Sequence, residues 1–286
     1  MRQRIDDYLA HLSQEEDYSE NTIAAYRNDL AQFCQWLEEH GRMGCGWENI
    51  TLEDITNYLF HLREREYAPS TIARKMAALK SYFHHLVEQE EILESPTNDV
   101  DGPKVKKYAP QALSRDGVAR LMAEAARLKN SKGLRDRAML ELLYATGMRV
   151  SELVNLEVNH LNMEQWTLRC GSGQNERVVP VAVRAVGALN DYLEKGRSQL
   201  VSGDEQPILF LNMRGNQLTR QGLWLIIKNY VERAGIKAEV TPHTLRHSFA
   251  IHRLNDGSEL SEVQGLLGHA NISTTQVYTH GREERE

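Results

Sequence analysis

Cysteines, long apolar runs and metal-binding spacings are scarce in this chain of 286 residues. The odd number and wide spacing of the three cysteines argue against a disulfide framework: Cys34, Cys45 and Cys170. There is no Cys-x-x-Cys pair and no His-Glu-x-x-His, so the 11 histidines show no recognisable metal spacing. No apolar run is long enough to cross a bilayer, and no apolar signal core follows the N-terminus. We therefore expect a soluble cytoplasmic protein without a metal site.

Positive charge is also in short supply, because the formal net charge is −6. From Met1 to Lys107 there are 12 basic and 20 acidic residues, whereas the remainder holds 22 basic and 20 acidic residues. The net negative charge of the chain thus comes from its N-terminal part. Binding of an anionic partner depends on local basic surface rather than on net charge. The composition lowers the expectation of tight non-specific nucleic-acid binding without excluding it.

The first hundred residues predict helices. Ser19 is a suitable N-cap for a helix that reaches Glu39, with apolar residues every three or four positions, and Gly41 ends it. Thr51 begins another helix, with Asp54 three residues later in an arrangement like a capping box.

A further helix is predicted over 71–88 and is opened by Pro69. Arg74 and Lys75 lie away from its apolar stripe, which by itself indicates a solvated face. The helical pattern breaks after it, and a segment with turn formers and three lysines follows, as is typical of an interdomain linker. The predicted organisation is a helical domain over 1–102, a basic linker over 103–111 and a second domain over 112–286.

The second domain combines helices with short strands. Helices are predicted from Ser114 to Leu128, over 134–146 up to Gly147, and over 151–156. Segments 166–170 and 177–181 favour two strands joined by a glycine-rich hairpin turn, and 207–211 favours another. The predicted fold class is mainly α, with a small antiparallel β-sheet in the C-terminal domain.

Three separated segments, 145–153, 241–250 and 267–280, concentrate residues suited to chemistry. Each has an ordinary structural explanation by itself, such as a surface ion pair or a core aromatic. Together they offer arginines that bind phosphate through bidentate hydrogen bonds, histidines that move protons, and a tyrosine nucleophile. A tyrosine with a pKa of about 10 is ionised in only roughly one molecule in a thousand at pH 7, so it needs cationic neighbours and a proton acceptor.

The three segments resemble the signature boxes of tyrosine recombinases, the phage-integrase family. The resemblance is carried mainly by the second and third segments, which read Thr-Pro-His-Thr-Leu-Arg-His-Ser-Phe-Ala and Leu-Gly-His-Ala-Asn-Ile-Ser-Thr-Thr-Gln-Val-Tyr-Thr-His. The resemblance covers nearly the whole chain and is nearest to the bacterial Xer branch, which resolves chromosome dimers. It implies a helical core-binding domain and a catalytic domain that close around DNA as a C-shaped clamp. It also implies site-specific recombination through a 3′-phosphotyrosine intermediate, without a cofactor.

The resemblance assigns a role to each matching residue. Arg149 and Arg246 would hold the scissile phosphate and stabilise its transition state. His243 would accept or relay the proton of the tyrosine, and His269 would bond the phosphate or assist that transfer. Tyr278 would attack, and Glu152 would orient Arg149.

The resemblance also implies double-stranded DNA as partner, bound by a homo- or hetero-tetramer in which a second recombinase can take part. Basic residues outside the boxes then become candidate DNA contacts: Arg74, Lys75, Lys104, Lys106 and Lys107.

Two departures from the family pattern bear on activity. The hairpin reads Gly171-Ser172-Gly173 where the family has Gly-Lys-Gly, so Ser172 replaces the lysine that protonates the leaving 5′-oxygen. Only eight residues follow Tyr278, where the family usually continues into a segment that docks on a neighbouring subunit. We therefore expect a monomer in free solution and a tetramer only on DNA. Two alternatives stay open: an integrase of a mobile element, although the extra arm-binding domain of such enzymes is lacking, and a catalytically impaired DNA-binding protein on the same fold.

Overall fold

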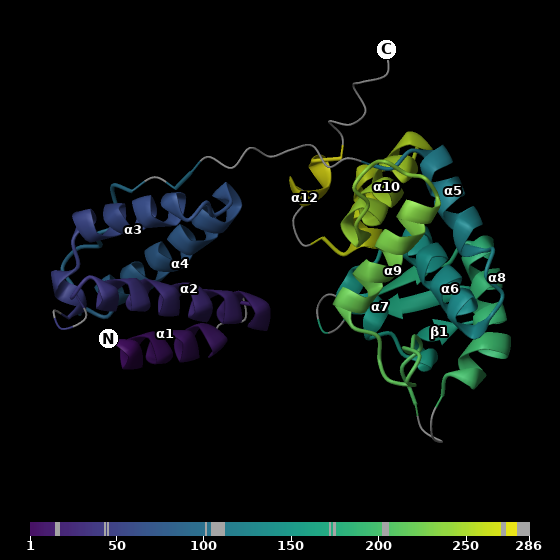
Figure 1. Ribbon diagram of the computed structural model, residues 1–286, viewed down its shortest axis with the longest axis horizontal. Helices are drawn as coiled ribbons and strands as arrows, with labels where there is room; N and C mark the ends of the chain where they lie inside the picture. Colours follow the sequence, from purple (N-terminus) through teal and green to yellow (C-terminus); the bar gives the residue numbers. More distant parts are fainter. Residues whose placement is uncertain are drawn as a thin grey trace, which may run out of the picture. The chain divides into compact units, whose positions relative to one another are not determined.

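The computed structural model divides the chain into two compact units, Met1–Lys107 and Tyr108–Glu286 (Figure 1). The structure describes residues 1–14, 18–42, 44, 46–100, 102–103, 112–171, 173, 176–201, 206–269 and 273–278. The division falls inside the predicted linker over 103–111, most of which lies outside the described residues. The predicted domain boundaries therefore stay a prediction.

The described part of the N-terminal unit contains one short 3₁₀ turn, η1 (Trp47–Asn49), and four α-helices: α1 (Arg2–Gln14), α2 (Glu20–Glu39), α3 (Leu52–Glu64) and α4 (Pro69–Glu88). Their starting points confirm the cap predictions. The Ser19 side chain accepts a hydrogen bond from the Thr22 N–H at 3.2 Å, and Thr51 and Asp54 form a reciprocal capping box. Each such cap contributes about 1 kcal/mol of helix stability.

Aromatic side chains form the centre of the N-terminal unit. Phe33, Tyr82 and Phe83 are fully buried, and Trp47 is nearly so. The ring of Phe33 lies 4.9 Å from that of Tyr58, and Trp47 meets Tyr82 edge-on at 4.9 Å. Such pairs add about 0.5–1.5 kcal/mol each beyond the burial of their area. The unit thus has a hydrophobic core of its own.

The C-terminal unit is built mainly from helices. Those in its described part are α5 (Arg115–Ala125), α6 (Ser131–Thr146), α7 (Val150–Val154), α8 (Val183–Asp191), α9 (Arg220–Arg233), α10 (Pro242–Asn255), α11 (Leu260–Leu267) and α12 (Ser273–Gln276). Shorter 3₁₀ and π turns are η2 (Val158–His160), η4 (Tyr192–Gly196) and η5 (Arg197–Gln199). Within the described ranges of both units, no helix is at once long and apolar enough to span a membrane.

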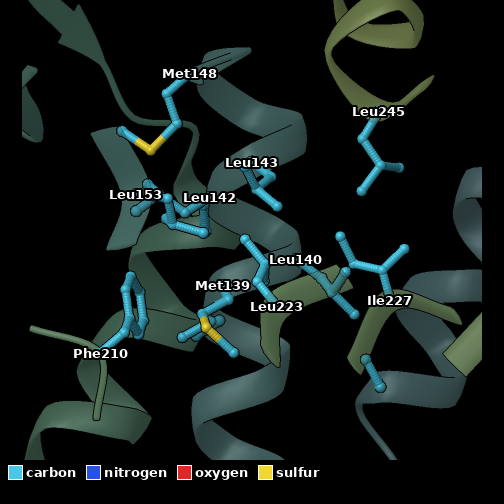
Figure 2. Close-up of a cluster of buried hydrophobic side chains, with 14 of the residues drawn as sticks. Met139, Leu140, Leu142, Leu143, Met148, Leu153, Phe210, Leu223, Ile227 and Leu245 are labelled. Carbon is cyan, nitrogen blue, oxygen red and sulfur yellow. The ribbon is translucent and has the colours of Figure 1, made fainter. Parts of the chain in front are cut away.

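Helix α6 is the central element of this unit. Met139, Leu140 and Leu142 are fully buried, so the helix carries apolar side chains on several faces and packs against α5, α8 and α10. Figure 2 shows these residues beside side chains of α9 and the start of α10. Helix α6 ends as predicted at Gly147, which adopts the left-handed conformation with φ of 62°.

A small antiparallel sheet of three strands in the order β1-β2-β3 covers part of the C-terminal unit. The strands are β1 (Leu161–Asn162), β2 (Thr167–Cys170) and β3 (Arg177–Pro180), and the last pair in register is Cys170 with Arg177. The predicted hairpin and the predicted fold class are confirmed, whereas β1 was not expected. The strand predicted over 207–211 is wrong: only isolated bridges at Ile208 and Leu211 form there, because the segment packs its buried side chains as a loop.

Candidate active site

One cleft of the C-terminal unit, with a volume of about 750 Å³, brings the three predicted segments together. It is lined by all five predicted catalytic residues, Arg149, His243, Arg246, His269 and Tyr278, and by neighbours from the starts of α7, α9 and α10. These residues span 130 positions of the sequence. The packing of α10 against α6 and α11 therefore gathers side chains suited to phosphate binding and proton transfer.

Arg149 lies just before α7 and is fixed by the first turn of that helix. The Glu152 carboxylate accepts a hydrogen bond from the Arg149 backbone N–H at 2.7 Å and another from its Nη1 at 3.0 Å. Nη2 donates to the carbonyl oxygen of Gly268 at 2.6 Å. The predicted orienting contact of Glu152 is thus present in the structure.

Arg177 holds Glu152 from the other side. Its Nη1 and Nη2 donate to the two carboxylate oxygens at 2.8 and 2.9 Å, and its Nε donates to the carbonyl oxygen of Leu266 at 2.7 Å. Burial raises the pKa of the Glu152 carboxyl, but the bonds from Arg177 and Arg149 outweigh burial and lower it below its usual range. Glu152 is therefore ionised at neutral pH and connects two arginines.

Arg246 is carried by α10, which begins at Pro242 after a capping box between Thr241 and Thr244. Its guanidinium group is buried and donates to the carbonyl oxygens of Gly147 and Leu267. Burial, followed by the charge of Arg149, lowers the pKa of Arg246 to about 10, which leaves it protonated at pH 7. Two cations thus lie close together at the cleft, an arrangement that an anion would stabilise.

The carbonyl oxygens that hold both arginines belong to helix ends. Gly147 ends α6 and Gly268 ends α11, both with left-handed backbone at φ of 62° and 63°. The last carbonyls of a helix lack partners within the helix and carry partial negative charge. They therefore satisfy their hydrogen-bonding capacity and position Arg149 and Arg246 through the same contacts.

Tyr278 is only 4% exposed and belongs to a hydrophobic cluster that also contains Phe249 and Leu267. Its backbone N–H donates to the carbonyl oxygen of Thr275 at 3.1 Å. Its hydroxyl lies 3.0 Å from Nδ1 of His247. Burial raises the pKa of Tyr278, while the charge of Arg246 acts in the opposite direction. The hydroxyl is therefore protonated at neutral pH.

The two predicted histidines occupy different environments. His269 is half-buried, its Nδ1 lies 2.9 Å from the Thr275 hydroxyl, and its ring stacks on that of Tyr278. Burial, followed by the charges of Arg246 and Arg149, lowers the pKa of His269 to about 4. His243 is exposed at the first turn of α10 and lines the cleft. The hydroxyl of Tyr278 contacts His247 rather than His243.

The sequence predictions missed the roles of His247 and Arg177. His247 is four residues after His243, a spacing that places both on one face of a helix and could have indicated it. Arg177 entered the sequence predictions only as the first residue of the strand predicted over 177–181. Its connection to Glu152 depends on tertiary packing, such as that of β3 against α11, for which the local sequence gives no signal.

Of the two predicted DNA contacts in α4, Lys75 requires a correction, whereas Arg74 stays a prediction. Lys75 does not lie on a solvated face: its side chain is 2% exposed, and its ammonium group donates to Asp29 at 2.9 Å and Gln32 at 2.6 Å. Arg74 is 44% exposed and also pairs with Asp29. As placed, Lys75 is not available to a phosphate, because its charge neutralises the buried carboxylate. The other predicted contacts, Lys104, Lys106 and Lys107, lie outside the described residues, as does Ser172.

Comparison with known proteins identifies the family. Residues 111–285 match the phage integrase family, and residues 5–90 match its N-terminal SAM-like domain. The chain therefore belongs to the phage integrase family, the tyrosine recombinases, and is an enzyme that cleaves and rejoins DNA.

Relatives within the family carry Xer names. The tyrosine recombinase XerC of Herpetosiphon aurantiacus is 48% identical over 286 residues, which cover 100% of this chain and 92% of the relative. The tyrosine recombinase XerD of Pseudomonas aeruginosa is 43% identical over 277 residues, which cover 96% and 92%. The similarity to Xer recombinases thus extends over both units.

Solved structures show the same fold. The XerH site-specific recombinase, in a post-cleavage complex with its palindromic difH substrate, gives a TM-score of 0.78 at 22% identity and covers 92% of this chain and 77% of that one. A lambda integrase dimer bound to a core site gives 0.75 at 16% identity and covers 100% and 97%.

Proposed function

We propose that this protein is a site-specific recombinase of the Xer type, in which Tyr278 attacks a DNA phosphate and forms a 3′-phosphotyrosine bond. One observation carries the proposal: the hydroxyl-bearing Tyr278 lines the same cleft as Arg149 and Arg246. The two relatives described above, at 48% and 43% identity, are named tyrosine recombinases XerC and XerD, which supports this branch over the integrases of mobile elements.

The two arginines are suited to bind the scissile phosphate. A guanidinium group has five N–H donors, and the side chains of Arg149 and Arg246 each make two hydrogen bonds to protein acceptors. Further N–H groups remain for phosphate oxygens in the cleft. As the phosphorus becomes pentavalent, negative charge grows on those oxygens, and fixed cations stabilise it without reorganisation. His243 and His269 line the same cleft, where they would bond the phosphate or relay protons.

The energy of the broken bond is retained in the phosphotyrosine. The 5′-hydroxyl of an exchanged strand can attack it, restore the phosphodiester and release Tyr278, so the sequence of steps needs no nucleotide cofactor. Exchange between two duplexes cuts all four strands, and each chain supplies one Tyr278. We therefore propose a tetramer on two double-stranded DNA sites, composed of this chain alone or with a second recombinase. Resolution of chromosome dimers in the cytoplasm is the biological role that fits an Xer recombinase.

The test is capture of the covalent intermediate on a nicked suicide substrate, whose cut end diffuses away. The wild-type protein should form an adduct that survives denaturant. Tyr278→Phe should form none, since it lacks the nucleophile, and Arg149→Ala or Arg246→Ala should form it about 100- to 1,000-fold more slowly while retaining much of the DNA affinity. An adduct of equal yield with Tyr278→Phe would contradict the assignment. Sequencing the DNA trapped from a genomic library would identify the target site.

A second candidate function rests on Ser172. Without the lysine of the family pattern, the chain could bind DNA as an architectural protein and lack cleavage activity. The same assay decides, because this alternative requires that the wild-type protein bind DNA and form no adduct.

A further inference from the structure

His247 contacts the reacting atom of the proposed mechanism. Its Nδ1 lies 3.0 Å from the hydroxyl oxygen of Tyr278, and the two ring centroids are 5.2 Å apart with the planes inclined by 57°. Both side chains line the cleft that holds Arg149 and Arg246. The geometry is that of a hydrogen bond in which either atom can hold the proton.

Both partners of this bond are held in place by the surrounding structure. His247 directly follows Arg246, whose guanidinium group is tied to the ends of α6 and α11. Tyr278 is buried by the apolar cluster, and its backbone is bound to Thr275. The contact thus joins two side chains that the protein itself positions, which is the arrangement expected of a nucleophile and its base.

We propose that His247 is a catalytic residue that accepts the proton of Tyr278 during strand cleavage. The inference rests on the proposed function and assigns one of its steps. The O–H bond of Tyr278 breaks and its proton moves to Nδ1 of His247. The tyrosine oxygen forms a bond to phosphorus, the bond from phosphorus to the 5′-oxygen breaks, and that oxygen takes a proton from water or from an acid of the site. In rejoining, His247 returns its proton to Tyr278.

The groups around His247 favour its neutral form. His243 and Arg246 face it from α10, Tyr278 faces it from the segment after α12, and His269 adds a neighbour from the end of α11. Burial, followed by His243 and Arg246, lowers the pKa of His247 to about 4, so its ring is unprotonated and able to accept at pH 7. A bound phosphate adds negative charge next to it, which favours the protonated ring and raises its pKa toward the working pH.

The experiment measures single-turnover adduct formation between pH 6 and 10 on a suicide substrate with sulfur in the 5′-bridging position. Because a thiolate leaves without a proton, the rate reports on the nucleophile alone. The chain offers a matched control on the same helix: Nδ1 of His252 lies 2.8 Å from the hydroxyl of Tyr144, on residues that line a separate pocket. The variants are His247→Ala, His247→Gln and His252→Ala, each with its DNA affinity measured.

His247→Ala should be about 100- to 10,000-fold slower at pH 7 at unchanged DNA affinity. Its rate should rise about tenfold per pH unit as Tyr278 ionises by itself, whereas the wild-type rate should be nearly flat. His247→Gln can hold the hydroxyl but cannot take its proton, so it should stay slow with the same slope. His252→Ala should keep the flat profile.

Three results would overturn the proposal. They are recovery of the rate by His247→Gln, no loss of rate in His247→Ala, and a loss that is equal at every pH. Failure of the proposed function has a different outcome, because the wild-type protein itself would then form no adduct.

Discussion

Among single residues, Glu152 links the two arginines Arg149 and Arg177. It accepts four hydrogen bonds, two from Arg149 and two from Arg177, and its side chain is 8% exposed. A buried carboxylate is tolerated because cations surround it. Arg177 therefore acts as a positioning residue, since it fixes the group that fixes Arg149.

Replacing Arg177 by Met should show this dependence. The change keeps an apolar stem but leaves Glu152 with half of its hydrogen bonds, so the full chain should lose about 3–5 kcal/mol of unfolding free energy, measured by urea denaturation. Cleavage should fall further than DNA binding, because Arg149 is released. The matched control is Arg169→Met, since Arg169 is half-exposed and pairs with Glu176 only at 3.9 Å. Such a pair contributes about 0–1 kcal/mol. Equal losses in both variants would contradict the positioning role.

The sequence motifs named five residues that the fold does bring to one cleft. They could not distinguish which histidine touches Tyr278, because both His243 and His247 fit the spacing of α10. The burial of Lys75 likewise could not be predicted from the sequence around it. Its partner Asp29 lies on another helix, and only the packing of α2 against α4 brings the two side chains together.

Among the elements, the ends of α6 and α11 combine a structural and a chemical task. A Cβ atom at Gly147 would lie 2.4 Å from the Phe249 ring, and one at Gly268 would lie 2.8 Å from Nη1 of Arg177. Both positions also have positive φ, which disfavours any other residue. The turns after the two helices therefore admit glycine alone if the carbonyls are to keep their places.

Gly147→Ala should disturb both packing and catalysis. Backbone strain together with the clash should cost about 1–3 kcal/mol of stability. Displacement of the Gly147 carbonyl should also slow adduct formation through Arg246. In contrast, Gly187→Ala in α8 meets open space and should stabilise the chain by about 0.5–1 kcal/mol with no effect on cleavage. Thermal unfolding and the adduct assay measure both; a Gly147→Ala protein with wild-type stability and rate would refute the interpretation.

The hairpin between β2 and β3 raises a separate question about the leaving group. Serine is a poor acid without positive charge, and Arg177 at the start of β3 has a guanidinium group that binds Glu152 and Leu266 and donates its proton poorly. General-acid assistance is worth about 100- to 10,000-fold. We therefore expect the wild-type protein to cleave a substrate with 5′-bridging sulfur far faster than the natural phosphate.

Ser172→Lys should speed cleavage of the natural substrate and narrow that difference. A control with Gln at the same position adds length but no acid, and should not help. Equal rates of the unmodified protein on both substrates would mean that another group supplies the proton.

Helix ends and the β2–β3 hairpin were predictable from caps, glycines and apolar periodicity. The segment over 207–211 was not, because a short buried apolar run looks alike in a strand and in a packed loop. Its Leu209 donates to Leu156 and Leu218 donates to its Phe210, but no continuous ladder forms. Tertiary packing decides that outcome.

For the whole molecule, charge is distributed unevenly between the two units. The N-terminal 107 residues have a net charge of −8, yet their last four include three lysines. We expect this basic segment to contribute phosphate contacts and the catalytic arginines to contribute chemistry.

Replacing Lys104, Lys106 and Lys107 by Ala should weaken DNA binding and flatten its salt dependence. Each lost phosphate contact lowers the slope of log K against log salt by about 0.9, so three should lower it by about 3. Titrations of labelled duplex at several salt concentrations measure this slope. Arg149→Ala should leave most of the slope intact and instead slow cleavage about 100- to 1,000-fold. The assignment of binding to the lysines and of chemistry to Arg149 is wrong if the lysine variant keeps the slope and Arg149→Ala loses it.

Tyr278 is buried in a cluster with Phe249, Leu254 and Leu267. In the proposed mechanism, this burial bears on whether a cut strand is rejoined or hydrolysed. Once the phosphotyrosine has formed, a water molecule and the 5′-hydroxyl of a DNA strand compete for the same phosphorus. The same catalytic groups on an open surface would hydrolyse the intermediate and act as a nuclease, leaving permanent breaks. Apolar side chains around the tyrosine would keep water away from the phosphotyrosine and so favour attack by the 5′-hydroxyl. In the proposed mechanism, the retained bond energy makes rejoining possible, and the hydrophobic cluster would favour rejoining over hydrolysis.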